Sequence, residues 1–356
     1  MFFLKLILLP FSCAYGVVVW CRNKLFDWGI FKSRIFKSTI ISVGNITTGG
    51  TGKSPHVQYL IDLIKGDFKV ATLSRGYKRK TKGFLVVESN TSAQNSGDEP
   101  KQFKFNFPNI LVAVGENRVE AIEQMLQLPQ APEVILLDDA FQHRWVKPQI
   151  QILLIDYNQL QEQNFMLPSG TLREFPSGQH RADIIVVSKA PKDLSPMEKR
   201  RFTEIIKPRE YQKIFYSYIE YSSLMPLNSS AEELLGDGLS SKLSDYKVLL
   251  FTGIANAEPL KNHLKNICKD VSELKFPDHH DFSLEDSRKI ISAFTNVLSS
   301  RKILLTTEKD AMRIKDSEAF AIPDNLPLFY IPIKVKFHQE KLNFDEVIFQ
   351  YLREGK

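Results

Sequence analysis

The chain has 356 residues, of which 43% are hydrophobic and 25% are charged, values that exclude a disordered, collagen-like or polytopic membrane protein. Its length predicts about two domains. The net charge of +6 is unevenly distributed: residues 1–80 carry 13 Lys and Arg against 3 Asp and Glu, or +10, and the rest carry 34 against 38, or −4. The basic surface is therefore N-terminal, where nucleic acid, anionic lipid or a phosphorylated substrate would fit it.

The first 20 residues are apolar except for Lys5, and basic residues follow at 22, 24, 32, 34 and 37. About 20 residues are enough to cross a bilayer. Pro10 in the middle of the run and Lys5 one turn from its start instead favour a helix that lies in or dips into one leaflet. A cleaved signal peptide and a buried core helix are the alternatives, but no basic region precedes the apolar run and the basic flank fits lipid headgroups. We therefore expect a membrane-associated helix over residues 1–28.

Short β-branched runs alternate with longer amphipathic stretches from residue 38 onward. Continuous apolar runs such as VILLDD and ADIIVVS are typical of strands buried on both faces, which occur in parallel sheets with helical crossovers. The pattern lapses near 210–225 and resumes with DYKVLLFTGIAN. The sequence predicts an α/β protein: a core like that of P-loop NTPases over 29–213, and a second, smaller α/β domain with linker strands over 214–356.

A glycine-rich segment, SVGNITTGGTGKSP, follows the first predicted strand at residues 42–55. Gly-Lys-Ser at the start of an amphipathic helix is the ending of a phosphate-binding loop, in which backbone N–H groups surround the β-phosphate. Lys53 would reach the β- and γ-phosphate oxygens, and the Ser54 hydroxyl would bind Mg²⁺. Thr47 stands where the first glycine of the usual pattern belongs, and an ordinary glycine-rich turn is the alternative. The residues expected to bind nucleotide are Thr47, Thr48, Gly49, Gly50, Thr51, Gly52, Lys53 and Ser54.

A second apolar strand ends in the acidic pair Asp138 and Asp139. A carboxylate delivered to the sheet edge beside a phosphate-binding loop is positioned to hold Mg²⁺, although an Asp after a buried strand is also a common helix cap. His143, five residues after Asp138, would either support the metal ligands from behind or be a surface or capping histidine. Two loops, 96–100 and 276–281, concentrate acidic and imidazole groups and are candidate catalytic segments, with a helix start and solvated histidines as the alternatives.

These segments resemble the tetraacyldisaccharide 4'-kinase family, the lipid A 4'-kinases. The motifs that carry the resemblance follow one another along nearly the whole chain. They are GNITTGGTGKSP (44–55), LSRGY (73–77), GDEP (97–100), DDAFQH (138–143), LPSGTLRE (167–174), FTGIAN (251–256), FPDHH (276–280) and TTEKD (306–310). The departures are Ser54, where Thr is usual, and Ala140, where Gly is expected.

The resemblance implies transfer of the γ-phosphate of ATP to the 4'-hydroxyl of a lipid A precursor, tetraacyl glucosamine disaccharide 1-phosphate. It also implies Mg²⁺ and a peripheral or monotopic location on the cytoplasmic face of the bacterial inner membrane. We expect neither nucleic acid nor an obligate protein partner.

The resemblance also implies roles for single residues. Asp98 would orient the 4'-hydroxyl and accept its proton, with His279 paired to it, and Lys53 would stabilise the transferred phosphoryl group. Arg75 would contact the lipid headgroup, although a structural salt bridge is an equal alternative. The magnesium ligands would be Ser54 together with Asp138, Asp139 and Glu174, and the sequence leaves open which of the three carboxylates touch the ion.

Two other functions share some of these features. A membrane-associated nucleotide switch or partner-delivery ATPase would have the same loop and acidic pair, and residues 187–190 resemble a base-recognition turn, but Asn-Lys-x-Asp is absent. A soluble kinase of a small metabolite leaves the apolar N-terminus unexplained. Nucleic-acid binding is disfavoured because the basic residues lack interleaved stacking platforms.

Overall fold

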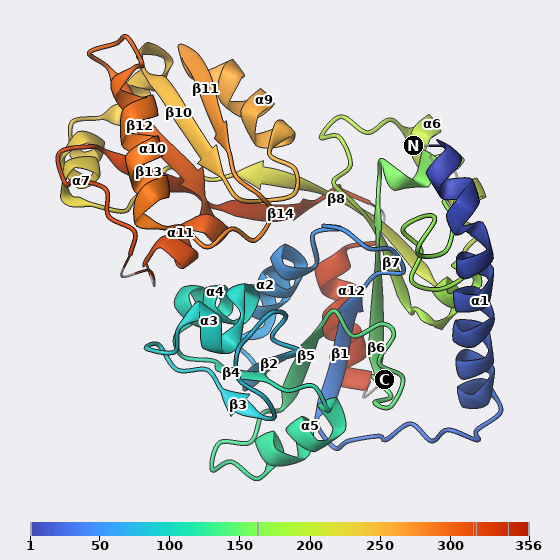
Figure 1. The fold of residues 1–356 in the computed structure, drawn as a ribbon. Helices are drawn as coiled ribbons and strands as arrows, with labels where there is room; N and C mark the ends of the chain where they lie inside the picture. The colour runs from blue at the N-terminus through green and yellow to red at the C-terminus, as the bar shows by residue number, and fades with distance from the viewer. Residues whose placement is uncertain (1, 162–163, 316, 318, 341, 355–356) are drawn as a thin grey trace. The chain divides into compact units, whose positions relative to one another are not determined.

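The computed structural model describes residues 2–161, 164–315, 317, 319–340 and 342–354. The chain divides into two compact units. The first comprises Met1–Thr91, Asn95–Ile219 and Val335–Lys356, and the second comprises Ser92–Gln94 and Glu220–Lys334, the latter drawn in yellow to orange in Figure 1. Each unit is built around its own sheet.

The larger sheet follows the order β14-β8-β7-β6-β1-β5-β2-β4-β3 in the described residues. Neighbours from β8 to β4 along this order are parallel, and β3 is antiparallel to β4. The strands are β1 (Thr39–Gly44), β2 (Val70–Ser74), β3 (Leu85–Val86), β4 (Leu111–Val114), β5 (Val134–Asp138), β6 (Ile150–Asp156), β7 (Ile184–Ser188), β8 (Lys213–Tyr221) and β14 (Ile333–Phe337).

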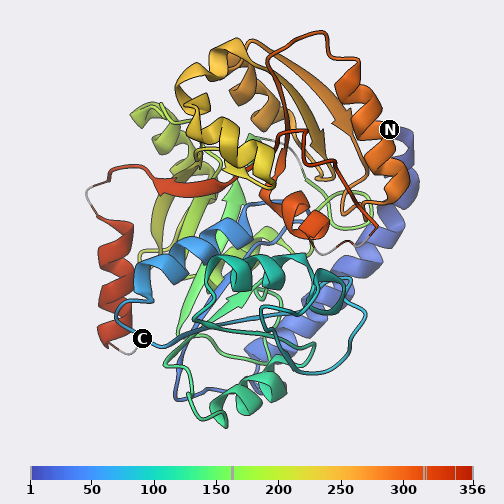
Figure 2. The same ribbon diagram turned by 90° about the vertical axis from the view of Figure 1, so that its left-hand side faces the viewer.

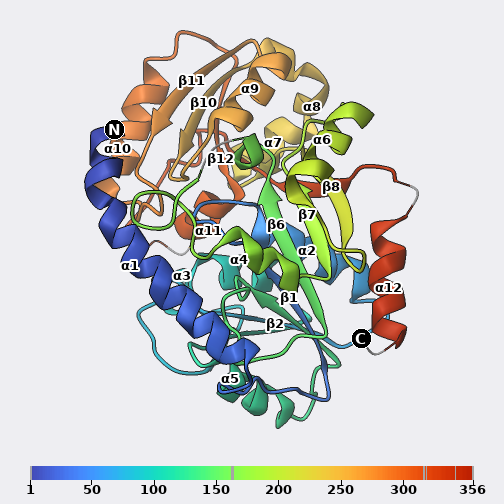
Figure 3. The ribbon, with the colours of Figure 1, turned by 90° about the vertical axis from the view of Figure 1, so that its right-hand side faces the viewer.

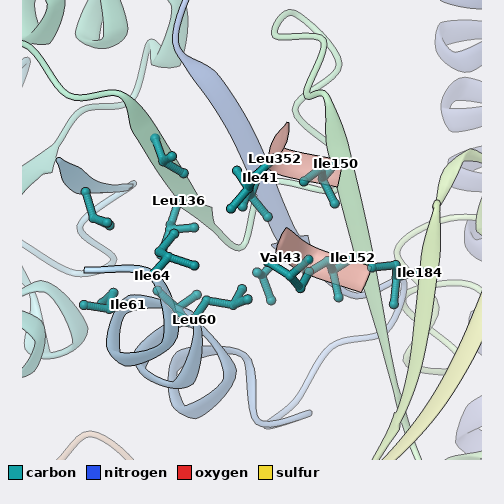
Figure 4. Close-up of a cluster of buried hydrophobic side chains, with 14 of the residues drawn as sticks. Ile41, Val43, Leu60, Ile61, Ile64, Leu136, Ile150, Ile152, Ile184 and Leu352 are labelled. Atoms are coloured by element: carbon teal, nitrogen blue, oxygen red, sulfur yellow. The ribbon is translucent and has the colours of Figure 1, made fainter. Parts of the chain in front are cut away.

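Helices cover both faces of this sheet. On one face α2 and α12 bury apolar side chains against alternate strand residues, and Figure 4 shows Leu60 and Ile64 of α2 and Leu352 of α12 around Ile41 and Leu136. On the other face α5 and α6 pack against separate apolar clusters. The helices of the first unit are α1 (Phe2–Asp27), α2 (Lys53–Ile64), α4 (Asp98–Asn106), α5 (Arg118–Leu126), α6 (Pro196–Ile206) and α12 (Phe344–Glu354), with 3₁₀ turns η1 (Gln159–Gln161) and η2 (Pro176–Arg181). The short helix α3 (Ala93–Ser96) is divided between the two units.

The predicted N-terminal helix is present as α1, the long blue helix that runs across the first unit in Figure 3. One of its faces packs on the protein: the Tyr15 hydroxyl donates to the carbonyl of Arg173 (3.0 Å), and Val19 joins an apolar cluster. Among the described residues, no helix combines the length and the apolar character that crossing a bilayer requires.

The second unit is a smaller α/β domain, as predicted. Its sheet has the order β11-β10-β12-β13-β9 in the described residues, with all neighbours parallel except β9. Apolar side chains are buried on both faces of this sheet. Its elements are β9 (Met225–Pro226), α7 (Ser229–Gly236), α8 (Leu239–Lys242), η3 (Leu243–Asp245), β10 (Lys247–Thr252), α9 (Glu258–Ile267), β11 (Asp270–Lys275), α10 (Leu284–Thr295), β12 (Lys302–Thr307), α11 (Glu308–Lys315) and β13 (Leu328–Ile331).

The division of the chain differs from the predicted boundaries of 29–213 and 214–356. The first unit continues to Ile219, and Val335–Lys356 belong to it and not to the smaller domain. The physical reason is the apolar face of α12, whose Phe344, Val347 and Ile348 are almost fully buried in the same cluster as α2. Figure 2 shows α12, in red, beside the strands of the first unit.

Candidate nucleotide and phosphoryl-transfer site

The predicted phosphate-binding loop, acidic pair and Arg75 all follow neighbouring parallel strands of the first unit. The order β1-β5-β2 and the pairing of Val43 with Asp138 bring the carboxyl ends of these strands to one edge of the sheet. Ligands of open α/β sheets bind at this edge. The structure therefore brings the phosphate-binding loop together with Asp138 and Asp139 of the metal-binding candidates.

The backbone of the loop has the conformation that its glycines allow. Gly49 has φ 105° and Gly52 φ 84°, in the left-handed region that costs a glycine little. Helix α2 starts directly afterwards at Lys53, so its unpaired N–H groups and its dipole point toward the loop, where they favour a phosphate. The Ser54 side chain is buried in this first turn.

Thr47 replaces a glycine because the start of the loop is extended. The segment 46–48 pairs with 171–173 in a short antiparallel bridge, in which Thr48 N donates to Thr171 O (2.6 Å) and Arg173 N donates to Ile46 O (2.8 Å). The Thr47 hydroxyl also donates to Gln159 Oε1 (2.9 Å). An extended residue needs no glycine, so the departure from the usual spacing leaves the loop intact.

Asp139 lies at the mouth of the loop between two cations. Its carboxylate accepts two bonds from the guanidinium of Arg173 (2.8 and 3.1 Å), and Lys53 Nζ is 3.6 Å from Oδ1. Burial raises the pKa of Asp139, but the charges of Lys53 and Arg173 outweigh it and hold the pKa below the ordinary value. The group is therefore ionised at neutral pH. Arg173 also donates to Asn45 and, through Nε, to Thr47 O (3.0 Å).

The donor set beside the loop fits magnesium. A hydroxyl from Ser54 and carboxylates from Asp138 and Asp139 are hard oxygen ligands, and Mg²⁺ usually takes one or two carboxylates together with substrate phosphates and water. Asp138 is 1% exposed at the end of β5, and Asp139 is the more accessible of the pair.

Glu174 is held in a different environment from the acidic pair. It is 1% exposed, and its two oxygens accept bonds from Arg181 (3.0 and 2.8 Å), Gln142 (2.8 Å) and Asn23 (3.2 Å). This network joins α1 to the loop before η2. These contacts favour a structural role for Glu174, and its predicted binding to Mg²⁺ stays a prediction.

A group of cations lies near the same edge. Arg75 follows β2 and is exposed, whereas Arg118 at the start of α5 is buried. Burial lowers the pKa of Arg118 to about 10, and the charge of Arg75 contributes. Burial likewise lowers the pKa of His143 to about 4, assisted first by the charge of Arg118. His143 is therefore neutral at pH 7 and lies in a cationic environment.

Asp98 is the first residue of α4, and its loop is packed against the loop of Arg75. Gly97 has φ 93°, and a Cβ there would lie 3.2 Å from the Cα of Gly76. A Cβ on Gly76, which has φ 69°, would lie 2.8 Å from the carbonyl of Ser96. Glycines at both positions thus permit the close approach that brings the motifs of Arg75 and Asp98 together.

His279 lies in the second unit, after β11. Its main-chain N donates to Gly253 O (3.0 Å), and Arg313 Nη2 is 3.1 Å from its Nδ1. Its side chain is 28% exposed, so the ring is accessible to a ligand.

Sequence reasoning singled out neither Arg173 nor Arg118. Arg173 lies inside the motif 167–174, next to Glu174, and the short bridge to the phosphate-binding loop that positions it pairs Thr47 with Leu172, 125 positions apart. Arg118 follows β4, the strand beside β2. The position of Arg118 shortly after a strand, at the edge of the sheet where ligands bind, is the feature of the sequence that could have identified it.

A mostly parallel sheet flanked by helices, with Gly-Lys-Ser at the start of α2 and an acidic pair after the adjacent strand, defines a P-loop nucleotide-binding enzyme. Comparison with known proteins specifies the enzyme further. The family model described as tetraacyldisaccharide-1-P 4'-kinase matches residues 4–353, and the chain belongs to this family.

Similar proteins cover almost the whole chain. The tetraacyldisaccharide 4'-kinase of Phocaeicola vulgatus is 44% identical over 354 residues, which are 98% of this chain and 95% of that protein. The tetraacyldisaccharide 4'-kinase of Flavobacterium johnsoniae is 43% identical over 352 residues, or 99% and 98% of the two chains. The crystal structure of LpxK from Aquifex aeolicus in complex with ATP is 32% identical, with a TM-score of 0.72 over 98% of this chain and 99% of that one.

The chain is therefore an ATP-dependent lipid kinase, a phosphotransferase with an alcohol group as acceptor. The sequence-based prediction of an ATP-dependent lipid kinase is confirmed, and the comparisons favour it over the alternative of a membrane-associated nucleotide switch.

Proposed function

We propose that this enzyme transfers the γ-phosphate of ATP to the 4'-hydroxyl of tetraacyl glucosamine disaccharide 1-phosphate at the cytoplasmic face of the inner membrane. The observation that carries the proposal is the position of Lys53, 3.6 Å from the ionised Asp139 at the mouth of the phosphate-binding loop. A phosphoryl group bound by the loop would lie between a cation that stabilises its charge and carboxylates that hold its metal ion.

The loop residues bind and orient the nucleotide. Backbone N–H groups of the loop after Thr48, whose own N–H donates to Thr171 O, surround the β-phosphate, and Lys53 stabilises the negative charge of the group in transfer. Ser54, Asp138 and Asp139 hold Mg²⁺, which when bound neutralises phosphate charge and fixes the phosphate geometry.

Asp98 orients the 4'-hydroxyl and accepts its proton. An ordinary carboxylate is too weak a base to ionise an alcohol in advance, but in a loose phosphoryl-transfer transition state the proton leaves late, so position matters more than basicity. His279, paired with Asp98 as the family resemblance implies, assists in the transfer of the phosphoryl group to the 4'-hydroxyl.

Arg75 and its cationic surroundings suit an anionic headgroup. The substrate carries a 1-phosphate, and a planar guanidinium donates two parallel hydrogen bonds to phosphate oxygens. Arg118 adds positive charge at the same edge of the sheet.

The outward face of α1 suits a lipid surface. Several apolar side chains of α1 are exposed, among them Phe11 (64%), Val18 (66%) and Trp20 (50%), whereas Tyr15 and Val19 pack on the protein. An exposed apolar helix face followed by basic residues binds anionic bilayers peripherally. We therefore propose attachment to the cytoplasmic face of the inner membrane, where the lipid substrate lies.

Steady-state kinetics test the role of Asp98. We expect Asp98→Asn to lower kcat by about 100-fold or more, the usual contribution of a positioned acid–base group, with the KM for ATP nearly unchanged. Glu99→Gln, a change of the same kind at the next residue, is the matched control and should keep most of the activity. A loss of ATP affinity in Asp98→Asn with kcat intact would refute the assignment.

Vesicle sedimentation tests the membrane surface. Phe11→Ser combined with Val18→Ser removes two exposed apolar side chains from α1 and should weaken binding to vesicles that contain anionic lipid by about 10-fold or more. Leu298→Ser, which changes an 88% exposed leucine of the second unit, is the control. Equal binding by the α1 variant and the control would contradict the proposed docking face.

A further inference from the structure

Three motifs of the second unit meet around one buried ion pair. Gly253 follows β10, His279 follows β11, and Asp310 and Arg313 lie on α11 directly after β12. Because β11, β10 and β12 are parallel neighbours, these segments share the carboxyl edge of the smaller sheet. The motifs FTGIAN, FPDHH and TTEKD therefore build one cluster.

The ion pair is rigidly held. Asp310 is 0% exposed, and its Oδ1 accepts from Arg313 Nη1 at 2.7 Å. Its Oδ2 accepts from the Thr307 hydroxyl (2.7 Å) and from Gly253 N (3.0 Å), and Arg313 Nη1 also donates to Gly253 O (3.1 Å). A buried charge pair with this many hydrogen bonds has little freedom to move, so the guanidinium has a fixed direction.

The guanidinium determines which ring nitrogen of His279 carries the proton. Arg313 Nη2 lies 3.1 Å from His279 Nδ1, and a guanidinium has donors but no acceptor. Nδ1 must therefore accept with its lone pair, and the proton of the neutral ring is on Nε2. On that side the Asp278 carboxylate is 4.0 Å from Nε2, which suits a nitrogen that carries a proton.

The main-chain conformation of His279 also restricts the position of its ring. His279 has φ 60°, unusual for a residue with a side chain, and its N–H donates to Gly253 O. A Cβ on Gly253 would lie 3.1 Å from the Cβ of His280 and 3.2 Å from Asp310 Oδ1, so a larger residue would displace the loop. Both the backbone and the side chain of His279 are thus positioned by this cluster.

We infer that Arg313, held by Asp310, is a positioning residue that keeps His279 with its proton on Nε2, so that His279 acts as a hydrogen-bond donor and not as a base. This inference rests on the proposed role of His279 in phosphoryl transfer. The lone pair of Nδ1 is engaged by a cation and Nε2 already carries a proton, so neither nitrogen is available to take the hydroxyl proton. That proton goes to Asp98 as the bond from O4' to phosphorus forms and the bond from phosphorus to the leaving oxygen of ADP breaks. His279 keeps its proton and donates a hydrogen bond to an anionic oxygen.

Long-range ¹H–¹⁵N correlation spectra of the full-length protein with ¹⁵N-labelled histidine test the inference without reference to activity. The resonances of His279 are assigned by their loss in His279→Gln. We expect an Nε2-protonated ring in the wild type at neutral pH, and a mixture of tautomers in Asp310→Asn combined with Arg313→Met, which removes both charges together. A wild-type ring protonated on Nδ1 would overturn the inference, and this spectrum decides the matter even where the double variant does not fold.

Kinetics separate a donor from a base. The side-chain amide of glutamine places an N–H near the position of Nε2 but cannot accept a proton there. We expect His279→Ala to lower kcat by about 10- to 100-fold and His279→Gln to recover most of that loss. A glutamine variant as slow as the alanine variant contradicts the donor role. Full activity of His279→Ala together with the expected tautomer would refute the proposed role of His279 while supporting its positioning by Arg313.

Discussion

The imidazole of His56 connects the phosphate-binding loop to β8, and its protonation provides a measurable test of that connection. Nδ1 lies 2.7 Å from Gly52 O and Nε2 lies 2.9 Å from the Ser217 hydroxyl. Because Gly52 O only accepts, Nδ1 carries the proton and Nε2 accepts from Ser217. Burial lowers the pKa of His56 from 6.5 to about 4, the bond to Gly52 opposes this shift, and the charge of Lys189 adds to it.

The pKa values of His56, 6.5 in the unfolded chain and about 4 in the folded protein, determine how stability changes with pH. Between pH 6.5 and 4 the unfolded chain binds the proton and the folded protein does not, so the free energy of unfolding falls as the pH decreases through this range. At about 1.4 kcal/mol per pH unit the full contribution is about 3 kcal/mol, of which about 2 kcal/mol is lost between pH 7 and pH 5.

Urea unfolding followed by tryptophan fluorescence measures this contribution. The three tryptophans, Trp20, Trp28 and Trp145, all lie in the first unit together with His56, so the signal reports the unit that contains the loop. We expect the free energy of unfolding of His56→Gln to fall by about 2 kcal/mol less between pH 7 and pH 5 than that of the wild type. His180→Gln, in the same unit, is the control. An equal fall in wild type and His56→Gln would refute the reasoning.

Further predictions concern residues whose surroundings were not evident from the sequence. Thr47→Gly restores the usual glycine but removes the hydrogen bond to Gln159, so it should lower the free energy of unfolding by about 1 kcal/mol. ATP binding measured by calorimetry should not become tighter, and tighter binding would contradict the extended conformation of the loop at Thr47. Glu174→Gln removes the charge that faces Arg181 and should lower the free energy of unfolding by about 2 kcal/mol. A changed Mg²⁺ requirement at unchanged stability would instead support Glu174 as a magnesium ligand. Asp139→Asn should raise the Mg²⁺ concentration for half-maximal rate by about 10-fold or more, and an unchanged requirement would exclude it as a ligand.

Local patterns predicted the elements that lie close together along the chain. The β1 strand, the glycine-rich loop and the amphipathic α2 helix are contiguous, and the acidic pair ends a continuous apolar run, so period and spacing were sufficient. The same reasoning predicted the smaller α/β domain, because its strands and helices alternate regularly.

Long-range packing determined what the sequence did not predict. The last 22 residues return to the first unit because the apolar face of α12 is buried with α2, and an amphipathic pattern does not identify the surface that it covers. Arg173 reaches Asp139 through a bridge between distant segments, and Glu174 differs from the acidic pair only through its contacts with Arg181, Gln142 and Asn23. Glu174 and the acidic pair were predicted together as metal ligands, and only the fold shows that their surroundings differ.

Transfer of labelled γ-phosphate from ATP to tetraacyl disaccharide 1-phosphate in detergent micelles with Mg²⁺ tests the central claim most directly. The position of the new phosphate is read by mass spectrometry of the product. We expect a bisphosphorylated lipid with label on the 4' position from the wild type and almost none from Lys53→Ala. Release of labelled phosphate to water without labelled lipid, or label at another position, would contradict the account.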